Sequence, residues 1–331
     1  MPICADSISV SANASRTMPS SNRQLAKPRA LRPGDTVGIV APASNIKQLD
    51  LEAGCAALRR AGYNPIYLDS ILEQDLYFAG SVARRASELQ DMFANNDVRA
   101  IVCGRGGYGA NYLLKALDRQ IIEAHPKIFV GYSDLTSLLT YFTVGAFVTF
   151  HGPMAAKDWA LEDGVDLPSW HAAVSGSVPW DVPINADTQA LIEGDADGVL
   201  NGGCLSIVVA ALGTPYEIQT EGAILFLEDI AAKPYQIDRM LMQLKLAGKL
   251  DAVRGIVFGE MLSCVQSTNQ SYTLQEVVTR IVGDLGVPVA FGLRSGHVTS
   301  RNITLPFGVQ ARLSVGSGKV KLRILEAAVR P

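Results

Sequence analysis

Short β-rich runs alternate with helical patterns from Leu31 onward, and this alternation limits the possible folds more than any other feature. Residues 36–40, 99–103 and 127–131 are largely apolar runs of strand length. Between the first two, Ser81 stands where the N-cap of a helix is expected, ahead of apolar residues at helical spacing. Such alternation predicts an α/β protein with a largely parallel sheet.

The segment 157–187 interrupts this alternation. It carries three prolines and no clear periodicity, so we interpret it as a linker between an N-terminal α/β domain, 31–156, and a C-terminal domain, 188–331. A chain of 331 residues agrees with this division, at ~150 residues per domain. The serine-rich residues 1–30 are predicted to form a disordered tail.

The alternation resumes after the linker. Gly202-Gly203 is predicted to lead a helix that ends near Leu212, and residues 222–227 and 255–259 read as strands. A helix is expected over 274–285. The last quarter of the chain reads as short β segments, so the second domain is also of the α/β class.

Composition excludes several classes of function. The formal net charge of −3 includes no basic block, which argues against nucleic-acid binding. No apolar run approaches the ~18–20 residues of a membrane span, and the first 30 residues lack the apolar core of a secretory signal. The sequence therefore predicts a cytoplasmic protein that acts on neither membranes nor nucleic acids.

The cysteines indicate neither a metal site nor a disulfide framework. They are odd in number, widely scattered and free of any C-x-x-C pair: Cys4, Cys55, Cys103, Cys204 and Cys264. Buried thiols in a reducing compartment are expected. No metal and no organic cofactor is predicted.

The residues 104–109 form a glycine-rich loop directly after a predicted strand. Gly104, Gly106 and Gly109 match the spacing of a dinucleotide-binding motif. That motif belongs on the first strand of the sheet, however, and this loop follows the third. Glycines let a backbone turn its N–H groups toward an anion. We therefore favour an oxyanion-binding loop.

Three further junctions carry groups suited to nucleophilic catalysis. Ser133 lies at a sharp strand-to-helix turn, where it either presents a nucleophile or caps the helix. Glu228 ends a buried apolar run, where it either orients a histidine or caps the next helix. His297 follows a strand in a glycine-flanked loop and is a candidate general base, with His151 as its rival.

Together these junctions give nucleophile, acid and base in the order Ser133, Glu228, His297. A serine hydroxyl needs a histidine to take its proton, and that imidazole needs a carboxylate on its other nitrogen. Ligands collect beyond the carboxyl ends of strands in open α/β sheets. Three separately ambiguous positions thus combine into one site.

The chain resembles the LD-carboxypeptidases of serine peptidase family S66, the murein tetrapeptide carboxypeptidases of peptidoglycan recycling. The resemblance spans roughly Leu31 to Leu325. It rests on residues 33–42, the loop 104–109, Gly131-Tyr-Ser-Asp134, His151-Gly-Pro153, Gly202-Gly203, Leu227-Glu-Asp229, Pro234 with Asp238-Arg239, and Gly296-His297.

The resemblance implies a role for each site residue. Ser133 is the nucleophile, Glu228 the orienting acid and His297 the base, while the backbone amides of Gly107 and Asp134 form the oxyanion hole. The implied reaction releases terminal D-alanine from an L,D-linked muropeptide. The implied fold is a parallel-sheet α/β domain joined to a C-terminal domain with a β-barrel-like sheet, as a homodimer.

A carboxypeptidase must also hold the free carboxylate of its substrate. Within the glycine-rich loop, Gly106 and Tyr108 are expected to contact substrate, and Arg105 is our candidate for the carboxylate because arginine binds carboxylates bidentately. Arg294 and Arg301 are its competitors. Arg294-Ser295 is also a departure, since members of the family often carry smaller or apolar residues before Gly-His.

Two other functions remain open on sequence grounds. The microcin C7 self-immunity peptidases are similar but cleave aminoacyl-nucleotide conjugates, which requires an aromatic platform for the base; Trp159, Trp170 or Trp180 of the linker are candidates for it. A non-catalytic two-domain binding protein for small ligands would leave Ser133 as a helix cap.

Overall fold

The computed structural model describes residues 25–265 and 271–331. Most of the expected tail, with Cys4, lies outside the described residues. Residues 25–30 belong to the tail by our prediction, but they are held by the body of the protein. The Ala26 N–H donates to the Ala146 carbonyl at 3.0 Å, and the Ala30 N–H donates to the Arg330 carbonyl at 2.7 Å.

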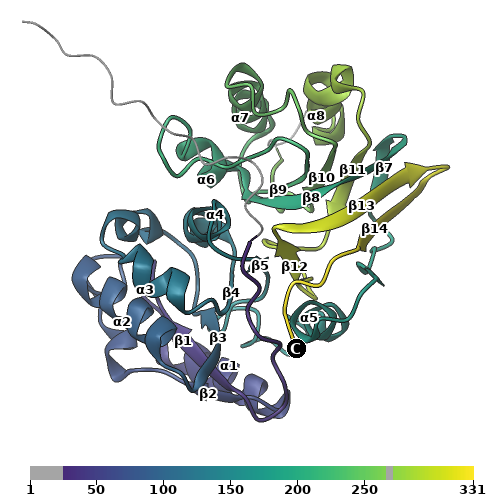
Figure 1. Cartoon of the computed structure of the whole chain (residues 1–331). Helices are drawn as coiled ribbons and strands as arrows, with labels where there is room; N and C mark the ends of the chain where they lie inside the picture. Colours follow the sequence, from purple (N-terminus) through teal and green to yellow (C-terminus); the bar gives the residue numbers. More distant parts are fainter. Residues whose placement is uncertain (1–24, 266–270) are drawn as a thin grey trace, which may run out of the picture.

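The first half of the chain supplies five strands, β1 to β5, of a six-stranded sheet with the order β12-β5-β4-β3-β1-β2 (Figure 1). All pairings are parallel except that of β12 with β5. The strands are β1 (Thr36–Val40), β2 (Asn64–Ile66), β3 (Val98–Cys103), β4 (Ile128–Gly131), β5 (Thr149–His151) and β12 (Leu305–Phe307).

Helices cover both faces of this sheet. Along β3, Ala100 and Val102 pack in one core with Leu58 of the first helix, whereas Ile101 packs in a second core with Leu89 of the second. Ser81 caps the second helix as predicted, since its side chain accepts from the Arg84 N–H. The helices are α1 (Gln48–Arg60), α2 (Val82–Ala94), α3 (Arg119–Ala124) and α4 (Thr136–Thr143), with the 3-10 turns η1 (Asp69–Leu72), η2 (Ala110–Lys115) and η3 (Ser133–Leu135).

The second half builds an eight-stranded sheet with the order β6-β14-β13-β8-β9-β10-β11-β7 (Figure 1). Strands β8 to β11 are parallel, and the flanking pairs are antiparallel. The strands are β6 (Trp180–Asp181), β7 (Gln189–Ile192), β8 (Gly194–Cys204), β9 (Ala223–Glu228), β10 (Gly255–Gly259), β11 (Val289–Leu293), β13 (Val309–Gly316) and β14 (Lys319–Ile324).

One face of this sheet packs against three helices, α6 (Leu205–Ala210), α7 (Pro234–Leu246) and α8 (Leu274–Val282), the last followed by the turn η4 (Gly283–Leu285). The other face shares a core with the first sheet. The sheet curls so that β7 also approaches β13 and β14. Among the described residues no ladder closes it into a barrel, so "barrel-like" describes its curvature only. The α/β class is confirmed.

The expected linker contains regular structure that sequence periodicity did not indicate. It holds the helix α5 (Leu167–Ser175) and the strand β6, and Trp170 is fully buried. One further expectation was wrong in its bounds. Gly202-Gly203 belongs to the strand β8, and the helix that follows it, α6, begins at Leu205 and ends at Ala210.

One strand crosses between the halves. β12 comes from the last quarter of the chain but forms the edge of the first sheet, antiparallel to β5, with Leu305 opposite His151. The two sheets are therefore joined by a shared core and by the crossing of β12 into the first sheet, as well as by the chain connection. In the described part of the chain, no helix is long and apolar enough to cross a membrane.

Candidate active site

The three candidate catalytic residues lie at the carboxyl ends of parallel strands that belong to different sheets. Ser133 follows β4 of the first sheet, while Glu228 ends β9 and His297 follows β11 in the second. The two sheets are packed so that Glu228 and His297 are in direct contact. This is where ligands are expected in open α/β sheets.

Glu228 and His297 form a buried hydrogen-bonded pair. The Nδ1 of His297 lies 2.7 Å from Glu228 Oε2, and the His297 backbone N–H donates to the same oxygen at 3.0 Å. The approach requires Gly296, because with its φ of +92° a Cβ would lie 2.6 Å from Glu228 Cδ. A carboxylate can only accept, so Nδ1 carries a proton and Nε2 is free to act as a base.

Hydrogen bonds keep the carboxylate ionised in spite of its burial. Glu228 is fully buried. Burial raises its pKa, but the neighbouring His151 and the hydrogen bonds from His297 outweigh that effect and lower the pKa of Glu228 to about 2. The site therefore holds a fixed negative charge beside the His297 imidazole, suited to stabilising an imidazolium.

Ser133 sits in a strained turn at the start of η3. Its φ of +62° lies in the left-handed region, which non-glycine residues seldom occupy outside functional sites. Its hydroxyl caps neither η3 nor α4, so the helix-cap interpretation is wrong. Gly106 of the glycine-rich loop faces it closely, since a Cβ there would lie 2.8 Å from Ser133 Cβ and 3.0 Å from its Oγ.

Tyr132 links the nucleophile turn to the base. Its ring packs edge-on against the His297 imidazole, with 5.1 Å between centroids, directly beside Ser133. The Tyr132 hydroxyl donates to Asp158 Oδ1 at 3.2 Å, and the Met154 N–H donates to Asp158 Oδ2 at 2.9 Å. Burial raises the pKa of Asp158 to about 6. Neither Tyr132 nor Asp158 was singled out from the sequence.

The glycine-rich loop lies against the backbone of the nucleophile turn. A Cβ on Gly106 would come within 3.4 Å of the Asp134 nitrogen. Gly107, at φ +103°, packs on Ser44, whose Oγ accepts from the Tyr108 N–H at 3.1 Å. Sequence reasoning missed Ser44, which anchors the glycine-rich loop from the segment that follows β1.

Two buried charged side chains, Asp134 and Arg85, form hydrogen bonds to the backbone at the end of the same loop. The Ala110 N–H donates to Asp134 Oδ2 at 2.7 Å, and burial raises the pKa of Asp134 to about 6. Arg85 donates through Nη1 to the carbonyls of Pro42 and Gly109, at 2.7 and 2.8 Å. Arg85 follows Arg84 in the helix α2, and nothing in the local sequence distinguishes it from a surface arginine.

Among the three candidate arginines, only Arg105 is free to meet a substrate. It is exposed on the glycine-rich loop and has no carboxylate partner among the described residues. Arg294 is held by Glu260 Oε1 at 2.9 Å, and Arg301 by Asp163 Oδ1 at 2.9 Å.

The exposed aromatic surface lies beside this loop and not in the linker. Trp159 and Trp170 are buried against one another at 5.2 Å, so neither offers a platform, and Trp180 is half-buried in β6. Instead, three exposed tyrosines surround Phe78: Tyr77, Tyr108 and Tyr112. Tyr108 was predicted as a contact, and the other aromatic residues were not.

His151 does not occupy the position of a base. Its ring is fully buried, with Nδ1 2.9 Å from Ser295 Oγ and Nε2 3.8 Å from Glu228 Oε1. Both nitrogens therefore face other protein groups. His297, which is 7% exposed, is the histidine at the edge of the site.

Cys204 lies beside the acid–base pair. It is opposite Glu228 in the β8–β9 ladder, and the potential ligand atoms of Cys204, Glu228 and His297 lie within 4.8 Å of one another. Burial raises the pKa of the Cys204 thiol, which keeps it protonated, and the other two groups are bonded to each other. These residues are therefore arranged as an acid–base pair beside a neutral thiol.

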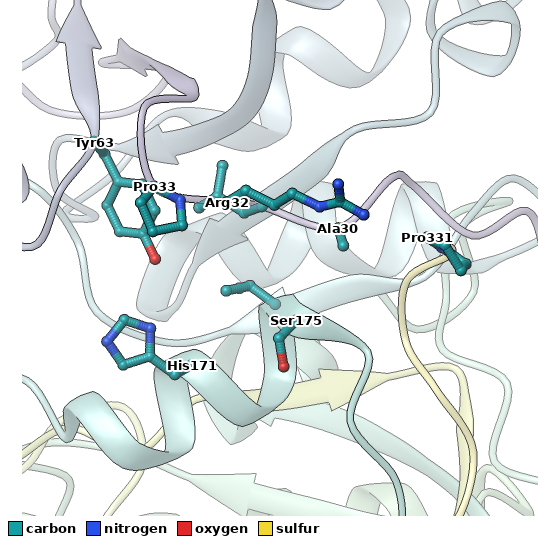
Figure 2. A pocket seen from close by; sticks show the side chains of 9 residues that line it. Ala30, Arg32, Pro33, Tyr63, His171, Ser175 and Pro331 are labelled. Atoms are coloured by element: carbon teal, nitrogen blue, oxygen red, sulfur yellow. The ribbon is translucent and has the colours of Figure 1, made fainter.

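A pocket of about 340 Å³ lies elsewhere, between residues 30–33, Tyr63, α5 and Pro331 (Figure 2). Figure 2 shows His171 and Ser175 of α5 on one side of it and Pro33 and Tyr63 on the other. None of the predicted site residues lines it.

Comparisons with known proteins identify both halves of the chain. Residues 37–152 match the model of the LD-carboxypeptidase N-terminal domain, and residues 197–313 match that of the LD-carboxypeptidase C-terminal domain. A Bacillus subtilis protein named "Probable murein peptide carboxypeptidase" is 37% identical over 307 residues, which cover 92% of this chain and 95% of that protein.

Two solved structures share the fold. The muramoyltetrapeptide carboxypeptidase of Oxalobacter formigenes superposes with a TM-score of 0.79 at 29% identity, covering 89% of this chain and all of that one. A microcin C7 self-immunity protein in complex with aspartyl sulfamoyl adenosine gives a TM-score of 0.85 at 23% identity, covering 92% of this chain and all of that one. The second likeness, at that identity, concerns the fold alone.

Proposed function

The chain belongs to the LD-carboxypeptidase family of serine peptidases, and from this premise we propose that it releases the terminal D-alanine from L,D-linked murein tetrapeptides. The observation that carries the proposal is the buried Glu228–His297 pair beside the strained Ser133 turn. As the resemblance implies, we place this activity in peptidoglycan recycling, in a cytoplasmic homodimer. The alternative of a non-catalytic binding protein is wrong, because the family is one of peptidases.

In the proposed mechanism, His297 takes the proton of Ser133 Oγ through Nε2 while Oγ attacks the carbonyl that precedes D-alanine. The resulting oxyanion is stabilised by the backbone N–H groups of Gly107 and Asp134. Glu228 holds the His297 imidazolium in place, and this imidazolium then protonates the leaving amine. Water, activated by the same histidine, then hydrolyses the acyl-enzyme.

Incubation with L-Ala-γ-D-Glu-meso-diaminopimelyl-D-Ala tests the function directly. We expect mass spectrometry to show the loss of one alanine from this peptide and no loss from the same peptide ending in L-alanine. Aspartyl sulfamoyl adenosine is incubated in parallel. An intact tetrapeptide together with a cleaved nucleotide conjugate would contradict the proposal.

Cleavage of the nucleotide conjugate has one structural observation in its favour. The exposed rings of Tyr77, Tyr108 and Tyr112 beside the glycine-rich loop could stack on a nucleobase. An aminoacyl-nucleotide conjugate is therefore the alternative substrate. The acyl-enzyme chemistry at Ser133 would be the same.

Replacing Arg105 by alanine is expected to lower kcat/KM for the tetrapeptide by about 10- to 100-fold, mainly through KM. The reason is the loss of a charge-assisted hydrogen bond to the terminal carboxylate, which contributes ~1.5–3 kcal/mol. Steady-state kinetics measure the effect. Arg301→Ala is the control and should leave both constants nearly unchanged, since Arg301 is held by Asp163. Unchanged kinetics in Arg105→Ala would exclude Arg105 as the carboxylate ligand.

A further inference from the structure

A second histidine is buried behind the acid of the proposed triad. His151 ends β5 and lies opposite Gly131 in the same sheet that presents Ser133. Its ring is fully buried, 5.1 Å from the ring of Phe226 and 5.4 Å from that of Phe307. The proposed reaction does not require water or substrate to reach His151. The hydrogen-bond partners of its two ring nitrogens must therefore be protein groups.

The hydrogen bonds of Ser295 determine the proton on one side of the His151 ring. Ser295 Oγ lies 2.8 Å from the Ile303 carbonyl and 2.9 Å from His151 Nδ1. The carbonyl can only accept, so the single hydroxyl proton is donated to it. Toward His151 the hydroxyl therefore accepts, and Nδ1 carries a proton.

On the other side of the ring, two buried atoms face one another. His151 Nε2 is 3.8 Å from Glu228 Oε1, and among the described residues neither atom has another hydrogen-bond partner. If His151 held only its Nδ1 proton, a lone pair would point at a carboxylate oxygen in a dry interior, which is unfavourable. One additional proton between Nε2 and Oε1 satisfies both atoms.

We propose that His151 is a positioning residue, which donates a proton from Nε2 to Glu228 Oε1 and so holds the carboxylate between two imidazoles. Glu228 then accepts from His297 through Oε2 and from His151 through Oε1. His151 also supplies a positive charge that balances the buried carboxylate. The inference rests on the proposed triad but not on the murein substrate.

Each element packed around His151 contributes to its electrostatic surroundings. The nucleophile turn presents Tyr132, whose ring centroid is 5.9 Å away, β9 presents Glu228, and the loop after β11 presents His297. β12 presents only the apolar Phe307. On balance burial lowers the pKa of His151, although the carboxylate of Glu228 opposes this effect. The second proton is therefore inferred from the geometry, in which Nε2 and Oε1 face one another without other partners among the described residues.

The effect on catalysis is exerted through the carboxylate. With His151 in place, each oxygen of the Glu228 carboxylate accepts a hydrogen bond from one imidazole, and both oxygens are fixed in position. Without it, the carboxylate is balanced by His297 alone. The buried negative charge beside the base then has one donor fewer to balance it, and the enzyme needs a higher pH to reach its reactive state.

The test compares His151→Phe, which keeps the ring but has no donor, with His151→Gln, whose amide can donate to Oε1. The measured quantity is the rate of Ser133 phosphonylation by a fluorophosphonate, recorded against pH. We expect His151→Phe to react about 10- to 100-fold more slowly at neutral pH, with the acid limb of the profile moved up by about one pH unit. His151→Gln should recover most of the rate.

Equal losses in both variants with an unmoved acid limb would show that His151 only fills space, and would overturn the proposal. If His151→Phe does not fold, ¹⁵N NMR of the wild-type histidine side chains decides: we expect protons on both ring nitrogens of His151 at neutral pH, and a bare Nε2 would overturn the proposal. Wild-type enzyme that is phosphonylated but leaves the tetrapeptide intact would contradict the murein function and not this inference.

Discussion

Ser133→Ala should lower kcat on the tetrapeptide by about 10⁵- to 10⁶-fold while leaving the fold intact, because the removal of a triad nucleophile leaves only binding and oxyanion stabilisation. The substitution deletes one oxygen from a half-buried side chain. It keeps a Cβ at a φ of +62°, so the strain of the turn stays. The measurements are single-turnover kinetics and thermal unfolding.

A second substitution at this position separates the loss of the nucleophile from the effect of backbone strain on stability. Ser133→Gly is equally inactive by our mechanism, but it should be more stable than Ser133→Ala by about 1 kcal/mol, because glycine adopts a positive φ at little cost. Ser137→Ala, in the following helix, is the control and should keep nearly full activity. A Ser133→Ala enzyme that retained one per cent of the wild-type kcat would rule out Ser133 as the nucleophile.

Gly202→Ala is expected to cause the largest loss of stability, at least about 4 kcal/mol in the free energy of unfolding. A Cβ at this position would lie 1.8 Å from the Phe226 carbonyl oxygen and 2.7 Å from its carbon, with φ at +151°. These are backbone atoms of the paired strand β9, so neither can rotate away. Strands β8 and β9 would have to separate where they carry Cys204 and Glu228.

Urea unfolding measures this effect against a matched control. Gly213 also has a positive φ, of +78°, but a Cβ there would meet nothing within 4 Å. Gly213→Ala should therefore show only the conformational cost, about 1–2 kcal/mol. If the two variants were equally stable, the close contact of β8 with β9 would not be what demands glycine.

The strands and the candidate triad could be predicted because their signals are local. The run 36–40 forms β1 with the expected bounds, since a buried parallel strand is apolar throughout. Glu228 ends such a run, and His297 stands in the loop that follows another. Carboxyl ends of parallel strands meet at one edge of a sheet, so their contact follows from the fold class.

Other features depend on contacts that no local pattern records. His151 and Ser295 are 144 residues apart, and their hydrogen bond exists only because two sheets meet. Gly202 and Gly203 read as helix-leading, but pairing on both sides of β8 imposes the extended conformation on a glycine-rich segment. Trp170 was expected in an open linker, yet α5 buries it against Tyr63.

The crossing strand β12 has a consequence for synthesis on the ribosome. The sheet that presents Ser133 takes its edge strand from residues 305–307, which are translated long after β5. Until they emerge, β5 has an unpaired edge beside His151, and a nascent chain cannot complete the sheet. Hydrolytic competence should therefore appear late in translation, once almost the whole of the chain described here is available to fold.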